Sequence, residues 1–454
     1  MTSSPSPNLP AVDGASFSRR SFLAAGAAGA AALAAVAPAQ SSGQSVVAEP
    51  PKTPAPKGTP PVPVKDGEPI KIGVIGTGGM GTGHCQALIG LAKAGKCNAE
   101  IVAVADVNDI NAGNAKAICE REQGGRTVES YRDYTKLLGR DDIRAVVIAT
   151  PEHWHAKTAA DAILAGKHVY LEKPMTLDLP DALFLRSVAL ANPGVVLQIG
   201  TQMTQLPKYK VAREMIRNGE IGVPVWSQTS YCRNSKSGEW TYYALDPNRK
   251  PGENLDWEAW CGPSGKAAWS DEVYARWRRF RKYSSGIIGD LLVHVMTPMM
   301  YAVDQGWPVH VTATASHMVD KTMENPDQIN LTIQFETGHI MIVAGSTANE
   351  VGLEKLIRGH KGNLYLESRH CEFRPERIFV DDGLDAKRVD CPDIGNDQDV
   401  HRLAFLESIR TGEKPIADID LSTKVMVVVD LATRSSWDGA AYRFDPKTLT
   451  AYRV

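Results

Sequence analysis

The stretch KIGVIGTGGMGTGH, which begins at Lys71, limits the possible folds of this chain more than any other feature. A β-branched apolar run leads into a glycine-rich turn and then into Leu and Ala at helical spacing, the strand, turn and helix of a Rossmann dinucleotide-binding unit. Gly76 permits the tight turn, Gly78 lets the backbone approach a pyrophosphate, and Gly81 lets the helix pack closely on the strand. The predicted cofactor contacts of this turn are Gly76, Gly78, Gly79, Met80 and Gly81.

A second predicted strand, EIVAVAD, ends in Asp106, 25 residues beyond Gly81. A carboxylate at this place accepts hydrogen bonds from an adenosine ribose and repels a 2′-phosphate. NAD is therefore favoured as the cofactor, although a basic neighbour would make NADP possible. The runs AVVIAT and HVYLEK add strands that alternate with helix-like segments, which predicts a doubly wound parallel sheet. A Rossmann-like domain without a nucleotide is the alternative.

Length and composition bound the organisation of the chain. About 385 residues follow the first 70, which is more than one hydrophobic core usually supports. We expect a Rossmann domain over residues 71–195 and a second domain over residues 196–454. The formal net charge of -2, with acids and bases mixed, argues against nucleic acid as a partner. The seven cysteines form no Cys-x-x-Cys pair, so neither a zinc site nor a disulfide framework is indicated.

The N-terminal 70 residues differ from the rest in composition. Arg19 and Arg20 precede an apolar Ala/Gly-rich run, and Ala37-Pro38-Ala39 offers small-residue spacing for cleavage, so residues 1–39 resemble a twin-arginine (Tat) export signal. The run is too short to span a bilayer, so we expect cleavage, a periplasmic protein and no stable membrane anchor. A disordered Ala-rich tail is the alternative. Residues 40–70 are Pro-rich and predict a linker, or an arm over the cofactor cleft or a neighbouring subunit.

The segment ATPEHWHAKTAADAILAGKHVYLEKPMT, with Glu172, Lys173 and Pro174 near its end, resembles the Gfo/Idh/MocA family of nicotinamide-dependent oxidoreductases. The resemblance continues through REMIRNGEIGVPV, YSSGIIGDLLVHVMTPMMYAV and HRLAFLESIRTGEKPIADIDLSTKVMVVVDLA, and so covers nearly everything after residue 70. It extends to the exported sugar oxidoreductases of the family. It implies that Lys173 contacts both cofactor and substrate and that Glu172 lies at the cofactor.

Asp290 and His294 are spaced i and i+4, so on a helix they project from one face. The resemblance places equivalent groups at the active site. We therefore predict His294 as the general base, Asp290 as its partner, and Lys173 as the cation that stabilises the developing alkoxide. The alternative is a pair of structural residues on a helix surface.

Other residues of the predicted site come from the ends of strands and from a basic aromatic segment. The resemblance implies that His153, Trp154 and His155 line the nicotinamide pocket, and Gln202 is expected to face cofactor or substrate. Histidines at this rim would in principle hold zinc with His294 and Asp290, but His-x-His is a weak signal and no metal is predicted. Thr150 and Pro151 complete the cofactor contacts. In YARWRRFRKYSSGIIGD, Arg278 and Tyr283 suit a sugar, or else mark a solvated helix end.

After residue 196 the strand-type segments lack helices between them, which predicts a C-terminal α+β domain with a large, mainly antiparallel sheet. One sheet face would pair subunits into a homodimer or homotetramer, as the family commonly does. The insert between Cys232 and Gly265 is a substrate-binding loop or a packed surface loop. The predicted function is hydride transfer between a carbohydrate hydroxyl carbon and tightly bound NAD. A redox-neutral NAD-dependent glycosidase and a non-catalytic binding protein are the alternatives.

Overall fold

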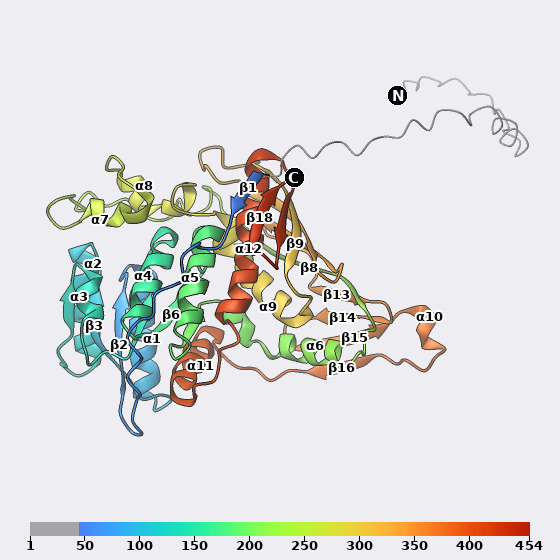
Figure 1. Cartoon of the computed structure of the whole chain (residues 1–454), viewed down its shortest axis with the longest axis horizontal. Coiled ribbons are helices and arrows are strands. Elements are labelled where there is room, and N and C mark those ends of the chain that lie inside the picture. Colours follow the sequence, from blue (N-terminus) through green and yellow to red (C-terminus); the bar gives the residue numbers. More distant parts are fainter. Residues whose placement is uncertain (1–44) are drawn as a thin grey trace, which may run out of the picture. The chain divides into compact units, whose positions relative to one another are not determined.

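A six-stranded parallel sheet forms the first half of the described chain, which comprises residues 45–454 of the computed structural model (Figure 1). The strand order is β4-β3-β2-β5-β6-β7. The strands are β2 (Ile70–Ile75), β3 (Ala99–Ala105), β4 (Glu129–Tyr131), β5 (Ala145–Ile148), β6 (His168–Leu171) and β7 (Leu197–Ile199). The helices are α1 (Gly79–Lys93), α2 (Asp109–Glu122), α3 (Tyr134–Leu138), α4 (Glu152–Leu164) and α5 (Leu179–Ala191).

This sheet confirms the predicted doubly wound fold. β2 lies between β3 and β5, so the direction of winding reverses at the carboxyl end of β2, where open α/β sheets bind their ligands. Every residue of β5 and β6 is buried, as expected for parallel strands covered on both faces. β7 belongs to this sheet, which therefore extends to Ile199, beyond the predicted boundary at residue 195.

A twelve-stranded sheet forms the second half. Its strands pair antiparallel except β8 with β11, which are parallel, so the prediction of a large, mainly antiparallel sheet is confirmed. In β10, Ile329, Leu331 and Ile333 are buried and the residues between them are exposed, so one face packs inward. The strands are β1 (Ser45–Ala48), β8 (Pro224–Asn234), β9 (Pro308–Ser316), β10 (Gln328–Phe335), β11 (Ile340–Ser346), β12 (Ala348–Asn349), β13 (Leu356–Gly359), β14 (Gly362–Leu366), β15 (His370–Pro375), β16 (Lys387–Asp390), β17 (Tyr442–Asp445) and β18 (Thr450–Arg453).

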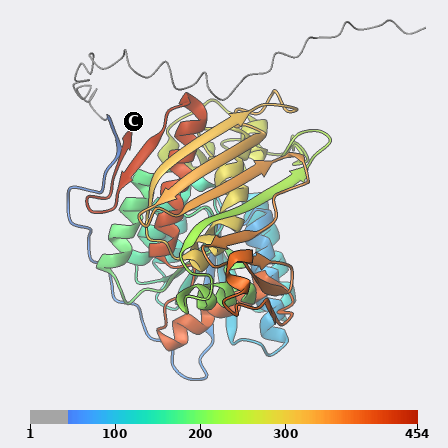
Figure 2. The ribbon, with the colours of Figure 1, turned by 90° about the vertical axis from the view of Figure 1, so that its right-hand side faces the viewer.

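Helices fill the space between the two sheets (Figures 1 and 2). These helices are α6 (Pro207–Arg217), α9 (Val293–Val303), α11 (Asp397–Thr411) and α12 (Ile419–Asp438). Figure 2 shows the large sheet in front and the helices behind it. Phe405 and Leu406 of α11 are buried in the same apolar cluster as β2 and β3, so the C-terminal segment completes the Rossmann core. The short elements are η1 (Gln202–Gln205), α7 (Trp257–Cys261), η2 (Gly262–Ser264), α8 (Asp271–Ala275), η3 (Trp277–Arg279), η4 (Ile288–Leu292) and α10 (Arg377–Val380).

The Pro-rich arm follows a different path from the one predicted. β1 pairs antiparallel with β18 at the edge of the large sheet, and the chain then runs down the Rossmann domain. The Thr59 amide donates to the Leu164 carbonyl at 2.8 Å, and the Gly58 amide donates to Asn192 Oδ1 at 2.7 Å. Leu164 and Asn192 end α4 and α5, and each helix precedes the next parallel strand, so the arm lies at the amino edge of the sheet. The prediction that it covers the cofactor cleft is wrong, because the glycine turn lies at the carboxyl edge.

The predicted Tat signal, residues 1–39, lies outside the described residues. Within residues 45–454, no helix has the length and apolar character needed to cross a bilayer. All seven cysteines are free thiols.

Candidate active site

The glycine turn after β2 has room for a ligand where the prediction requires it. Gly76 has φ +84°, and a Cβ there would lie 2.7 Å from the Thr150 backbone nitrogen. A Cβ on Gly81 would overlap the Gly76 carbonyl oxygen, because α1 packs tightly on β2. At Gly78 and Gly79 a Cβ would meet no heavy atom within 4 Å, and no side chain caps the start of α1. A ligand can therefore approach the backbone of Gly78 and Gly79 closely, and the uncapped start of α1 leaves amides for a pyrophosphate.

Asp106 follows β3 beside this turn. Its Oδ2 accepts from the Thr77 amide at 2.7 Å, and its Oδ1 accepts from the Asn108 amide at 2.9 Å. Burial raises the pKa of Asp106, and these donors oppose the shift. Thr77 Oγ1 also donates to Oδ2 at 3.3 Å, whereas Oδ1 retains a lone pair, so the group can also accept a ribose hydroxyl. The residues present therefore fit the adenosine half of NAD.

Lys173, Asp290 and Arg278 form a buried cluster of charges. Lys173 Nζ donates to both the backbone oxygen and Oδ1 of Asp290 at 2.8 Å, and Arg278 Nε donates to the same Oδ1 at 2.9 Å. Burial alone would raise the pKa of Asp290, but the two cations outweigh it and hold that pKa well below its usual range. Asp290 is therefore ionised at neutral pH, and one ammonium hydrogen of Lys173 remains for a ligand.

His294 lies one turn beyond Asp290, as predicted. Burial, together with the Lys173 ammonium, lowers the pKa of His294 to about 3, so the ring is neutral at pH 7. Within residues 45–454 its buried Nδ1 has no hydrogen-bond partner. Tyr231 of β8 lies against it, with ring centroids 6.0 Å apart. A neutral, unpaired imidazole beside a lysine ammonium has the charge state that a general base needs.

The backbone that carries this pair is not one regular α-helix. Asp290 belongs to η4, a π-helical turn, and His294 to the first turn of α9. A Cβ on Gly289 would overlap Ser285 Oγ and would lie 3.2 Å from Pro174. The turn that carries Asp290 thus packs directly on the segment that follows Lys173. Single π turns of this kind are frequent at functional sites.

Glu152 is a site residue that the sequence analysis missed. It is the first residue of α4, and its carboxylate accepts from Ser284 Oγ at 2.6 Å and from the Ser285 amide and Oγ at 3.0 and 3.1 Å. Burial raises its pKa to about 7 despite these donors. Glu152 fastens the Rossmann domain to the turn that carries Asp290. The partners are more than 130 residues apart in sequence, so no local pattern pairs them.

Glu172 takes part in a second connection between the domains, which runs through His84 to Arg402. Arg402 Nε of α11 donates to His84 Nδ1 at 3.0 Å, so His84 carries its proton on Nε2 and donates to Glu172 Oε1 at 2.7 Å. Burial alone would raise the pKa of Glu172, but His84 and Lys173 outweigh it and lower that pKa to about 2. The carboxylate therefore contacts protein groups and positions the strand end before Lys173. Its predicted contact with the cofactor remains a prediction.

His153, Trp154 and His155 at the start of α4 make hydrogen bonds to backbone carbonyls. His153 Nε2 and Trp154 Nε1 both lie 2.8 Å from the Trp260 carbonyl oxygen, in the insert. His155 Nδ1 and Nε2 lie 2.7 and 2.8 Å from the carbonyls of Pro174 and Thr150. Burial lowers the pKa of His153 to about 4 and also lowers that of His155. These side chains fix neighbouring loops, and their place beside the nicotinamide remains a prediction.

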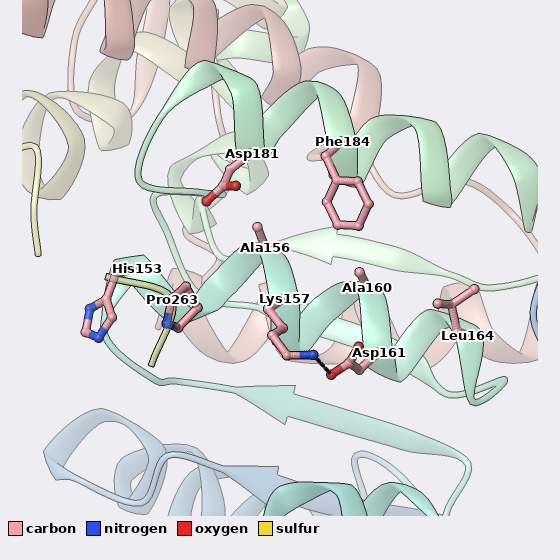
Figure 3. Close-up of a pocket in the computed structure, with 9 residues that line it drawn as sticks. All are labelled: His153, Ala156, Lys157, Ala160, Asp161, Leu164, Asp181, Phe184 and Pro263. Atoms are coloured by element: carbon pink, nitrogen blue, oxygen red, sulfur yellow. Dashed lines mark hydrogen bonds and ion pairs between the residues drawn. The ribbon is translucent and has the colours of Figure 1, made fainter. Parts of the chain in front are cut away.

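A groove of about 240 Å³ lies between α4, α5 and Pro263 (Figure 3). His153 lies at one end of the groove, and Lys157 and Asp161 form an ion pair between successive turns on one face of α4. None of the predicted catalytic residues lines this groove.

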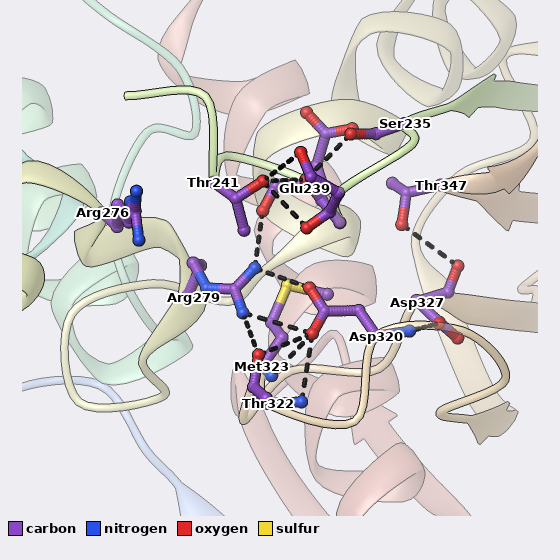
Figure 4. A network of polar contacts seen from close by, with 12 residues as sticks. Ser235, Glu239, Thr241, Arg276, Arg279, Asp320, Thr322, Met323, Asp327 and Thr347 are labelled. Atoms are coloured by element: carbon purple, nitrogen blue, oxygen red, sulfur yellow. Dashed lines mark hydrogen bonds and ion pairs between the residues drawn. The ribbon is translucent and has the colours of Figure 1, made fainter. Parts of the chain in front are cut away.

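Arg278 and Tyr283, both predicted to bind substrate, differ in their placement. Arg278 reaches Asp290, while its neighbour Arg279 is buried and donates to Asp320 Oδ2 at 2.6 Å and to the Glu239 carbonyl at 2.8 Å (Figure 4). Arg279 thereby anchors the segment from which Arg278 reaches the site. Tyr283 packs against Trp260 with centroids 4.9 Å apart and is 3% exposed. Its predicted role at the substrate is wrong, because it belongs to a buried aromatic cluster.

The remaining predicted cofactor contacts lie around the glycine turn or at the start of η1. Thr150 follows β5, and its buried Oγ1 has no hydrogen-bond partner within residues 45–454, which leaves it available to a cofactor group. Met80 is 41% exposed in the first turn of α1, and Gln202 begins η1 partly buried. The roles of Met80, Pro151 and Gln202 remain predictions. Residues 45–454 contain no group of three His, Cys, Asp or Glu side chains placed to hold a metal ion.

Two family models match nearly the whole described chain. Residues 70–200 match the Gfo/Idh/MocA oxidoreductase family, NAD-binding Rossmann fold, and residues 213–443 match its C-terminal alpha/beta domain. The chain belongs to the Gfo/Idh/MocA family. Its Rossmann domain is therefore an NAD-binding domain.

Similar proteins within this Gfo/Idh/MocA family include dehydrogenases of cyclic polyols and sugars. Inositol 2-dehydrogenase 1 of Saccharopolyspora erythraea is 32% identical over 156 residues, 34% of this chain and 44% of the relative. Glucose-6-phosphate 3-dehydrogenase of Bacillus subtilis is 25% identical over 330 residues, 71% of this chain and 79% of the relative. The chain thus spans about half the length of the inositol dehydrogenases it matches.

Solved structures share the fold of both domains. Levoglucosan dehydrogenase in complex with NADH has a TM-score of 0.62 at 20% identity, covering 82% of this chain and 98% of that one. An oxidoreductase domain protein from Kribbella flavida has a TM-score of 0.63 at 19% identity, with the same coverage.

Proposed function

We propose that this protein is an NAD-dependent oxidoreductase that transfers hydride between a hydroxyl carbon of a sugar or cyclic polyol and a tightly held cofactor. The observation that carries the proposal is the cluster of Lys173, Asp290 and a neutral His294 at the carboxyl edge of an NAD-binding Rossmann domain. The names of the relatives, inositol 2-dehydrogenase and glucose-6-phosphate 3-dehydrogenase, support a carbohydrate substrate.

Each catalytic side chain has a separate task. Bound NAD supplies the chemistry of hydride acceptance. His294 accepts the proton of the substrate hydroxyl, because its low pKa keeps it neutral. Lys173 donates its remaining hydrogen to the same oxygen and stabilises the developing alkoxide. Asp290 holds the ammonium in place and balances its charge in a buried site.

Arg278 extends this arrangement toward the substrate. Its guanidinium lies over the Trp277 ring at 4.2 Å and over the Tyr243 ring at 5.8 Å, while its Nε is held by Asp290. The other guanidinium hydrogens are donors in a fixed plane beside two aromatic faces. Such a pairing suits a sugar ring, which has apolar faces and hydroxyls on its edge.

Anaerobic titration tests the proposal. Purified protein is mixed with myo-inositol, glucose 6-phosphate, levoglucosan and a panel of free sugars while the absorbance of reduced nicotinamide is followed. We expect one class of substrate to produce NADH, and the His294→Phe variant to produce none while still binding NADH. Release of an aglycone from aryl glycosides without net NADH would favour the redox-neutral glycosidase. A protein that contains no cofactor on denaturation and responds to no sugar contradicts the proposal.

Export through the Tat pathway to the periplasm is part of the proposal and rests on the sequence of residues 1–39. Tat export of an already folded protein would carry the cofactor across the membrane with it, which an enzyme in a compartment without free NAD requires. Replacing Arg19 and Arg20 with Lys should leave cofactor-loaded precursor in the cytoplasm. Periplasmic protein that is free of cofactor and binds NAD weakly would contradict this part.

Assembly as a homodimer or homotetramer through the outer face of the large sheet completes the proposal. Along β10 this face presents Asn330, Thr332 and Gln334, while the alternating apolar residues face the helices. Light scattering of the purified protein should give a mass of two or four chains. A mass of one chain at micromolar concentration contradicts it.

A further inference from the structure

The chain between β8 and η4, residues 235–287, includes most of the insert predicted between Cys232 and Gly265, and from here on the whole segment is called the insert. It reaches the carboxyl edge of the Rossmann sheet at two separate places. α7 and α8 of this insert lie beside α2 and α4 (Figure 1). One anchor is the loop after β3, which carries Asp106, and the other is the start of α4 after β5. Because β2 lies between β3 and β5, the insert spans the strand end that bears the glycine turn.

The first anchor is built from backbone and side-chain hydrogen bonds. The Asp109 amide donates to the Asn254 carbonyl at 2.8 Å, and the Asp256 amide donates to the Val107 carbonyl at 2.9 Å. Asn108 Nδ2 donates to the Tyr274 hydroxyl at 2.9 Å, and this asparagine is 1% exposed. The backbone amide of Asn108 also donates to Asp106 Oδ1. Tyr274 therefore holds the residue that orients the Asp106 carboxylate.

The second anchor is the start of α4. The Trp260 carbonyl oxygen is contacted by both His153 and Trp154 at 2.8 Å. Gly262 has φ +42°, and any Cβ there would overlap the Trp154 ring. Aromatic packing joins the two anchors, since the Trp260 ring lies 5.0 Å from His153 and 5.7 Å from Tyr274. Val107, directly after Asp106, packs on the same cluster.

One short segment of the insert, from Tyr274 to Arg278, connects the Asp106 loop with Asp290. Tyr274 lies beside the Asp106 loop, and Arg278, four residues later, binds Asp290. Arg279 fixes this segment from the other side through Asp320 and Thr322 (Figure 4). The Tyr274 hydroxyl accepts from Asn108 and Asn111, at 2.9 and 3.3 Å, while its own hydrogen has no acceptor within residues 45–454. That hydrogen is available to a ligand.

We propose that the insert is the retaining wall of the dinucleotide site and that Tyr274 belongs to the adenosine half of that site, where it fixes the Asp106 loop and offers its hydroxyl to the ligand. The inference rests on the proposed function and gives tight cofactor retention a physical cause. An NADH molecule held under this wall leaves only when the contacts of Trp260 and Tyr274 open.

The rate of NADH release tests this role. Full-length protein is loaded with NADH and mixed with a large excess of NAD, and the loss of bound-nicotinamide fluorescence gives the dissociation rate. Tyr274→Phe removes the acceptor of a buried amide, which should raise the rate roughly tenfold. Tyr274→Ala also removes the ring and should raise it further. Tyr242→Phe is the matched control, because this exposed tyrosine of the same insert has Glu239 as its single hydrogen-bond partner within residues 45–454, and its rate should be unchanged.

The outcomes separate a failure of this inference from a failure of the proposed function. Cooperative melting of the cofactor-free variants, with midpoints above the assay temperature, shows that the fold is retained, and Tyr274→Phe is the smaller change of the two. Wild-type release rates in both Tyr274 variants would overturn the inference while leaving the proposed function intact. Failure of the wild-type protein itself to bind NADH would overturn both.

Discussion

The two edges of the Rossmann sheet each receive an irregular segment from elsewhere in the chain, and the two segments are held in different ways. At the amino edge the Pro-rich arm is attached by a few backbone hydrogen bonds, such as Thr59 to Leu164, and most of its residues are exposed or half-exposed. At the carboxyl edge the insert buries Trp257, Trp260 and Tyr283 and carries the buried Arg279–Asp320 ion pair.

This difference in attachment indicates which of the two segments contributes to function. Segments with few buried apolar contacts open at low free-energy cost, whereas segments with buried aromatic clusters open with the domain itself. Only the carboxyl edge carries the glycine turn, Lys173 and Asp290. Changes at that edge should therefore alter chemistry and cofactor retention, and changes at the amino edge should alter stability alone.

The largest effect is expected from Lys173→Met at the carboxyl edge. The variant loses the ammonium that stabilises the alkoxide, so kcat should fall by about 10³-fold, in line with the loss of a donor to a developing oxyanion. Lys157→Met is the control, since this lysine forms an exposed ion pair on α4 and should keep full activity. Steady-state kinetics measures both. A fall of less than tenfold in Lys173→Met would contradict its catalytic role.

Glu152→Ala is expected to have the next largest effect. It leaves the hydroxyls of Ser284 and Ser285 and one amide without their acceptor, which should cost about 2–3 kcal/mol of stability. It also frees the turn that carries Asp290, so kcat should fall by roughly 10²-fold while the KM for NAD changes little. Glu253→Ala, at an exposed position of the insert, is the control. Unchanged kcat would show that Glu152 is only structural.

The pH dependence of stability provides a subtler test of the same residue. Burial raises the pKa of Glu152 to about 7, so the folded state binds a proton that the unfolded state has already lost above pH 4.5. The stabilisation from this proton is complete at low pH and disappears as the pH rises through 7. Between pH 5 and pH 8, wild type should lose stability relative to Glu152→Gln by up to about 3 kcal/mol. Asp290 strengthens the shift and Arg278 weakens it.

The smallest effect is expected at the amino edge. A chain that begins at Lys65 lacks β1 and the arm, and should unfold at a temperature lower by a few degrees, because it loses edge-strand pairing and little apolar burial. Its kcat and its NADH release rate should equal those of the intact chain. Faster release of NADH from this truncated chain would show that the arm helps to retain the cofactor. It would contradict the assignment of cofactor retention to the carboxyl edge alone.

Part of this site could be predicted from the sequence because its signals are local. The glycine turn, Asp106 and Lys173 each follow a strand within a few residues, and the parallel sheet brings such strand ends to one edge. His153 and Tyr283 could not be assigned in this way, since the direction of each side chain depends on the insert that packs on it. Glu152 gave no signal at all, because its role arises from a contact with Ser284 across 132 residues.

The position of α11 has a consequence for how the protein is made. Phe405 and Leu406 fill the core that β2 and β3 begin, and β18 (Thr450–Arg453) pairs with β1 (Ser45–Ala48). During synthesis the Rossmann core therefore stays incomplete until α11 has emerged, and the large sheet stays incomplete until β18 has emerged. Until then the Rossmann segment exposes an unfilled apolar face, which is a hazard for aggregation in a nascent chain.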